Sequence, residues 1–194
     1  MVHLGVTELT ETPVETRDAA EVGVEATQSA WAEAARAVLI EAARSYRSVV
    51  SQKELAAAVQ SSSGIHTDRR VHYWIDDVLG AVARDSAARE EPLLSALCVN
   101  RESSVGAAYG AIVLELTGEA PEDPDDHAAR ERLACYRFFE AKDLPADGGT
   151  SALVPQLANA RARVRKAAIA MRPVRTCPTC YMELLPTGVC DTCD

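Results

Sequence analysis

Four of the six cysteines lie in the last eighteen residues of the 194-residue chain, where they form two Cys-x-x-Cys pairs. Cys177 and Cys180 make the first pair, Cys190 and Cys193 make the second, and nine residues separate the pairs. Turns of this kind let two sulfurs approach one metal ion to about 2.3 Å while backbone N–H groups point at the sulfurs. The spacing therefore predicts a tetrahedral thiolate site within residues 176–194.

The four cysteines resemble the ligands of zinc ribbons, and the resemblance implies a small hairpin around one structural Zn²⁺. A shell of four protein ligands leaves no position for water, so we expect the metal to hold the tail folded and to catalyse nothing. A rubredoxin-type iron site uses the same four sulfurs and stays open as an alternative. Disulfides are disfavoured in a reducing cytosol, and redox Cys-x-x-Cys pairs usually begin a helix near a βαβ unit, which the pattern lacks.

A basic segment precedes the cysteines, since residues 152–176 hold six bases and no acid. Its pattern predicts a helix, with Pro155 tolerated in the first turn. The six bases are candidate contacts for nucleic-acid phosphates: Arg161, Arg163, Arg165, Lys166, Arg172 and Arg175. At 100° per residue, Arg161, Arg165 and Arg172 fall on one stripe of this helix.

The opposite side of the basic helix is mostly apolar, with Leu157, Val164, Ala168 and Met171. A second interpretation therefore stays open, in which the bases form a solvated face that pairs with acidic residues of the same chain at 115–126. That partner is always present at high local concentration.

Composition favours closely packed helices, because hydrophobic residues make up 47% of the chain and aromatic residues only 5%. A net charge of −9 argues against a protein that coats nucleic acid by bulk attraction, but it permits a local basic contact. No apolar run approaches the roughly 20 residues that span a bilayer. The first residues lack the pattern of a secretory signal, so we expect a cytoplasmic protein with no membrane contact.

We predict a mainly α (α+β) fold, and local patterns place its first elements. Residues 26–46 form an amphipathic helix, and Ser51 with Glu54 forms a capping box for the next helix. Residues 70–88 give a further core helix, and the apolar run 93–100 is interpreted as a short buried strand. The predicted parts are a flexible acidic arm (1–24), a winged-helix-like domain with a short strand pair (25–116), an acidic linker (117–125), an additional helix (126–150), a basic helix (151–175) and a zinc ribbon (176–194).

The order of helix, capped helix, longer helix, strand and turn is typical of winged-helix variants. From Tyr46 to Tyr109 the layout also resembles the DNA-binding domain of alkylguanine-DNA alkyltransferases and alkyltransferase-like proteins. "EPLLSA" stands where those proteins carry Pro-Cys-His-Arg, and Cys98 has no neighbouring His, so alkyl transfer is not implied. The whole chain is similar to uncharacterised proteins of actinobacteria and their phages that end in a zinc ribbon, which implies an architecture but no activity.

Enzymatic chemistry has little support in the sequence. The adjacent acids Asp76–Asp77 and Glu90–Glu91 diverge on a helix and are expected to face solvent. No nucleophile has a recognisable setting, and no phosphate-binding Gly-rich loop occurs. His127 is expected at the surface near a helix start, and Cys98 and Cys135 are expected to be small buried hydrophobes.

The leading hypothesis is a nucleic-acid-associated regulatory protein of phage or mobile-element origin, in which the ribbon and the basic helix contact DNA. The acids Asp76 and Asp77 would repel phosphates on the face of the 70–88 helix. A protein–protein adaptor that binds a host factor, with purely structural zinc, is therefore the alternative. The sequence leaves the oligomeric state open.

Overall fold

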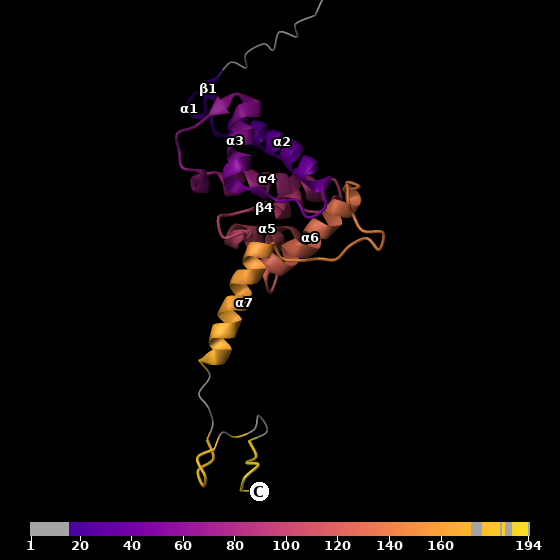
Figure 1. Ribbon diagram of the computed structural model, residues 1–194. Coiled ribbons are helices and arrows are strands. Elements are labelled where there is room, and N and C mark those ends of the chain that lie inside the picture. The colour runs from indigo at the N-terminus through magenta and orange to yellow at the C-terminus, as the bar shows by residue number, and fades with distance from the viewer. Residues whose placement is uncertain (1–15, 172–175, 183, 185–187, 194) are drawn as a thin grey trace, which may run out of the picture. The chain divides into compact units, whose positions relative to one another are not determined.

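The computed structural model describes residues 16–171, 176–182, 184 and 188–193, and most of them are helical (Figure 1). The mainly α prediction is therefore confirmed. The chain divides into two compact units with the boundary between Val154 and Pro155. The helices of the first unit are α1 (Ala19–Val22), α2 (Val24–Ala43), α3 (Gln52–Ser63), the 3-10 helix η1 (Val71–Tyr73), α4 (Ile75–Ala88), the 3-10 helix η2 (Leu94–Leu97), α5 (Gly106–Thr117) and α6 (Pro124–Phe138). The second unit begins with α7 (Pro155–Ala170).

Two short parallel strand pairs tie distant parts of the first unit together. They join β1 (Arg17–Asp18) to β3 (Ile65–His66) and β2 (Val50–Ser51) to β4 (Cys98–Val99). The strand predicted over 93–100 is thus mostly the turn η2, and only its last part is extended. The residues after the following turn begin α5, and the described chain contains no antiparallel strand pair that could serve as a wing. The winged-helix identity stays a prediction.

The capping box that begins α3 is confirmed in full. The Ser51 Oγ accepts a hydrogen bond from the Glu54 N–H at 3.2 Å, and the Ser51 N–H donates to the Glu54 carboxylate at 2.9 Å. Two N–H groups at the two ends of the box are thereby satisfied. The helix ends at Gly64, whose φ of 67° places it in the left-handed region that glycine adopts without strain.

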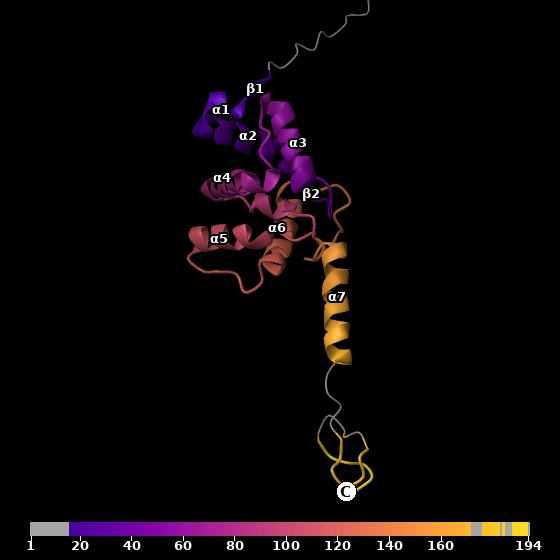
Figure 2. The same ribbon diagram turned by 90° about the vertical axis from the view of Figure 1, so that its left-hand side faces the viewer.

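Helix α4 lies between the α2–α3 pair and α5 in both views of the molecule (Figure 2). Its face with Val78 and Val82 packs into a core formed with α2, α3 and η2, at whose edge the Trp31 and Trp74 rings meet with centroids 4.3 Å apart. Ala83, on the other face, belongs to a second apolar cluster with α5 and α6. Helix α4 therefore contributes buried side chains to both apolar cores.

Two segments differ from their predicted descriptions. Residues 17–22, assigned to a flexible arm, form β1 and α1, and the Arg17 N–H donates to the Gly64 carbonyl at 2.8 Å. Residues 1–15 of that predicted arm lie outside the described residues, and its last residue, Val24, begins α2. Helix α6 begins after an Asp123 cap, earlier than the predicted start at residue 126, and it ends well before residue 150.

The reason for the shifted cap is the role of Asp125 inside the first unit. Its carboxylate is buried and accepts hydrogen bonds from the Val105 N–H at 2.9 Å and from the Ser104 hydroxyl at 3.1 Å. Asp123 Oδ1 meanwhile accepts from the first free N–H groups of α6, and Pro124 fills the first helical position, where no N–H is needed. Asp125, whose partners are about 20 residues away, is thus a residue of the first turn of α6, and Asp123 is the cap.

No described helix combines the length and the apolarity that crossing a lipid bilayer requires, so no candidate membrane span occurs in the described part of the chain.

Candidate metal centre

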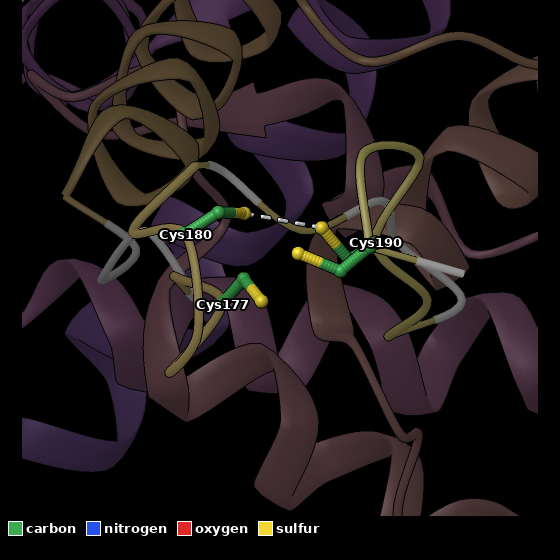
Figure 3. A group of neighbouring side chains, drawn as sticks. Cys177, Cys180 and Cys190 are labelled. Atoms are coloured by element: carbon green, nitrogen blue, oxygen red, sulfur yellow. Dashed lines mark hydrogen bonds between the residues drawn. The ribbon is translucent and has the colours of Figure 1, made fainter.

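The two predicted Cys-x-x-Cys pairs come together in the second unit. One sulfur from each of Cys177, Cys180, Cys190 and Cys193 lies in a group whose members are all within 4.8 Å of one another. Figure 3 shows the Cys177, Cys180 and Cys190 side chains turning toward a common space between two loops. Cys177 and Cys190 are buried, and Cys193 is exposed. The sequence thus identified all four members of the cluster.

Backbone hydrogen bonds shape the turn that carries Cys177 and Cys180, which is called the first knuckle below. The Cys177 N–H donates to the Met182 carbonyl at 2.8 Å, and the Tyr181 N–H donates back to the Cys177 carbonyl at 2.9 Å. Tyr181 has a φ of 59°, which lets the chain reverse after the second cysteine. The N–H groups of Cys180 and Thr179 also bond the Cys177 sulfur and lower the pKa of this thiol to about 6.

The cluster fits a metal ion better than it fits a disulfide. Four sulfurs at 2.3 Å from one tetrahedral centre stand about 3.8 Å apart. The Cys180 and Cys190 sulfurs are 3.4 Å apart, far beyond the roughly 2.05 Å of a disulfide bond, and all six cysteines are free. Contacts with the neighbouring thiols, first with Cys180, raise the pKa of Cys193 to about 12. A bound cation would let all four sulfurs ionise together and would close the hairpin.

Helix α7 carries the described part of the predicted basic face. Arg163, Arg165 and Lys166 are exposed, and Arg161 is half-buried. Arg172 and Arg175, which completed the predicted set, lie outside the described residues. None of the residues of α7 is buried, so its sequence forms a regular helix that leaves the side chains available to solvent.

The carboxylates and histidines behave less uniformly than the sequence suggested. Asp76 and Asp77 are exposed in the first turn of α4, as expected. Glu91 is not solvated as predicted, because Arg36 binds its two oxygens at 2.7 and 2.9 Å and only 14% of the side chain is exposed. His127 lies in the first turn of α6 and its Nδ1 is 3.0 Å from the Tyr109 hydroxyl. These partners are 18 or more residues apart, and no local pattern signals them.

The two remaining cysteines are part of the core, as predicted. Cys98 in β4 and Cys135 in α6 are fully buried. Desolvation raises the pKa of Cys98 to about 12 and raises that of Cys135 as well. Such thiols stay protonated at neutral pH and behave as small apolar groups.

Comparison with known proteins adds no relationship. Neither a protein-family model, nor a curated protein, nor a solved structure matches this chain. The resemblances drawn from the sequence therefore stay predictions.

Proposed function

We propose that this protein is a nucleic-acid-associated regulatory protein, in which a zinc-stabilised tail and α7 contact the phosphate backbone. One observation carries the proposal. Arg163, Arg165 and Lys166 are exposed on α7, and none of them forms an ion pair or hydrogen bond with a residue that the structure describes. Cations without a protein partner are available to phosphates, whose neutralisation releases condensed counterions.

The bases of α7 lie close together along the helix. Arg161 to Lys166 extend over about 7.5 Å of the helix axis, or roughly two base pairs of duplex DNA at 3.4 Å each. No acid occurs over residues 152–176, so the bases of the helix have apolar side chains and no carboxylates beside them, although the whole chain is acidic. The contact proposed here fixes position on nucleic acid and reads no bases.

Zinc is the ion that we propose for the thiol cluster. Its support is the set of four sulfurs with no other ligand type, since closed thiolate shells are typical of structural zinc. Metal analysis of purified protein should give about one zinc per chain, and replacement by Co²⁺ should give the absorption of a tetrahedral thiolate site. One iron per chain instead of zinc would overturn this assignment.

The winged-helix-like assignment of residues 25–116 belongs to the same proposal. The succession of α2, the capped helix α3, α4 and β4 supports it, whereas no antiparallel wing is present among the described residues. The proposed contact does not require this assignment, because the bases that carry it lie on α7.

A salt series with a short DNA duplex tests the proposal. Six phosphate contacts give a slope of log K against log salt of about −5.4, and three contacts give about −2.7. We expect the Arg163→Gln, Arg165→Gln, Lys166→Gln triple variant to weaken binding and to flatten the slope toward the smaller value. Removing three charges from the first unit, with Lys53→Gln, Arg69→Gln and Arg70→Gln, is the matched control.

The outcomes of this series separate the sites. The α7 variant should lose affinity while the control retains most of it. The reverse result would move the contact to the first unit and would overturn the role of α7. Absence of binding at low salt, with intact zinc-loaded protein, would eliminate a nucleic-acid function.

A protein adaptor is the second candidate, and a specific observation favours it. Val164 and Ile169 expose 71% and 60% of their surfaces on α7, and Met171, directly after this helix, exposes 83%. Exposed apolar side chains at this density are typical of surfaces that bind another protein. If the salt series shows no DNA binding, the adaptor predicts that Val164→Ser and Met171→Ser leave the helix folded and remove binding of a defined partner.

A further inference from the structure

A cavity of about 350 Å³ opens beside α4 and α5 in the first unit. Its polar lining includes Asp76, Asp77, Ser95 and Tyr109, and its apolar lining includes Leu79 and Ile112. Cavities of roughly 300–1,000 Å³ with apolar walls and a few convergent polar groups are typical of small-molecule sites. The proposed nucleic-acid contact uses none of these residues, so any function of the cavity is a separate one.

Ser95 in η2 gives the first sign of a ligand. The residue is only 3% exposed, and its hydroxyl forms no hydrogen bond with any described group. Buried polar atoms are normally paired, because leaving a donor or acceptor without a partner costs about 1–3 kcal/mol. Ser95 also lines the cavity, so rotation of its side chain would offer this hydroxyl to a bound molecule.

The charges at the cavity define the chemistry of this molecule. Asp76 and Asp77 form no ion pair with a described residue, although Gln52 lies 3.4 Å from an Asp76 oxygen. Arg84, the base of the lining, is held by Glu115 through two bonds of 2.7 and 2.9 Å, and its charge also interacts with that of Asp77. Desolvation and the neighbouring Asp77 raise the pKa of Asp76, as expected for a carboxylate without a cation. The two aspartates favour a positively charged ligand.

Gly80 explains how α4 leaves room for the ligand. A Cβ placed on Gly80 would stand 3.5 Å from an Arg84 nitrogen and 3.8 Å from the Ile112 Cδ1, both in the cavity lining. These are ordinary contacts, so a small side chain fits and a large one would fill the space. Glycine in a helix interior costs about 1 kcal/mol of stability relative to alanine. At Gly80 this cost is accompanied by a cavity that stays open.

We propose that this cavity binds a small organic cation, with its charged head at Asp76 and Asp77, its apolar body against Leu79 and Ile112, and a polar atom at Ser95. Amines and amidines with a compact apolar group have this chemistry. The inference concerns the first unit alone and does not depend on the function proposed for α7.

Benzamidine and benzamide are matched probes for the test, since they share a shape and differ in charge. Titration of full-length, zinc-loaded protein, followed by amide and indole NMR signals, should show saturable binding of one benzamidine with shifts at Ser95 and Ile112. Benzamide should bind about two- to tenfold more weakly, because it lacks the charge that two carboxylates recognise.

Three variants locate the site. Asp76→Asn with Asp77→Asn should weaken benzamidine at least about tenfold, and Gly80→Leu should block it while both carboxylates remain. Glu119→Gln with Glu122→Gln removes the same charge from exposed positions outside the cavity and should change little.

The proposal has clear ways to fail. It is overturned if benzamide binds as well as benzamidine, if the aspartate variant binds normally, or if no saturation occurs below about 10 mM. A neighbouring cavity of about 440 Å³ shares Asp77 and is lined by Trp31 and Trp74. Shifts confined to the two indole N–H signals would place the ligand there and would also refute the assignment.

Discussion

Replacement of Cys190 by serine should release the metal and unfold the C-terminal hairpin, while the first unit keeps its thermal transition. Cys190 is 6% exposed, and its sulfur lies 3.4 Å from that of Cys180. A serine hydroxyl is a poor ligand for zinc, because it does not ionise at neutral pH as a thiol in a metal site does. The variant therefore leaves three thiolates and an open shell.

The size of the expected loss in folding free energy depends on which other interactions stabilise the C-terminal hairpin. Among the described residues of the second unit only Cys177 and Cys190 are buried. Tyr181, Met182 and Val189 expose 79%, 58% and 47% of their surfaces, so hydrophobic burial contributes little. Structural zinc supplies about 10–16 kcal/mol of apparent binding free energy in small zinc domains. Nearly all of the folding free energy of the hairpin should thus disappear with the metal.

Metal analysis, NMR and calorimetry on the full chain measure the outcome. We expect zinc to fall from about one ion per chain to none after dialysis against a weak chelator. Amide signals of residues 176–193 should collapse toward random-coil positions. The melting temperature of the first unit should shift by less than about 1 °C, because the lost interactions lie in the other unit.

A matched control is Cys98→Ser, which places a hydroxyl at a buried position of the first unit. It should cost about 1–3 kcal/mol in that unit and leave the zinc content unchanged. The reasoning is refuted if Cys190→Ser retains its zinc. It is equally refuted if that variant lowers the melting temperature of the first unit as Cys98→Ser does.

Two further predictions concern the first unit. Iodoacetamide applied to native, chelator-treated protein should alkylate four cysteines and spare Cys98 and Cys135. These two thiols are buried and their pKa values are raised, so they react slowly. Mass spectra that show six modified thiols would contradict their place in the core. Ser51→Ala should cost about 1 kcal/mol in urea unfolding, because the Glu54 N–H loses its cap. Ser62→Ala, in the exposed last turn of the same helix, is the control, and equal stability of the two variants would refute the importance of the cap.

The features predicted well from the sequence are those encoded within a few residues. Ser51 and Glu54 are three positions apart, and their box needs only the local backbone of a helix start. Helix α4 lies within the predicted range 70–88, where apolar residues recur at helical spacing, and its buried residues include Val78 and Val82. The cysteines obey the same logic, since each knuckle is a four-residue turn.

The features predicted badly depend on partners far along the chain. Every residue of 93–99 is buried, so the segment has no polar side and its period cannot distinguish a strand from a turn of helix. Arg17 lies in an acidic stretch without periodicity, and only Ile65, in a distant strand, gives it a β partner. Asp123, Asp125 and Asp126 are all acceptable caps locally, and the hydrogen bonds from Ser104 and Val105 decide among them.

The two candidate sites also differ in whether their residues are close together in the sequence, and this difference decides how each should be tested. The thiol cluster comes from one short segment, so any fold upstream is compatible with it and removal of one cysteine tests it directly. The cavity is assembled from α4, η2 and α5, and no pair of its polar residues forms a recognisable motif. A variant there can fail by disturbing the fold. Gly80→Leu and the paired aspartate variant should therefore both lose benzamidine binding, the first for a steric reason and the second for an electrostatic one.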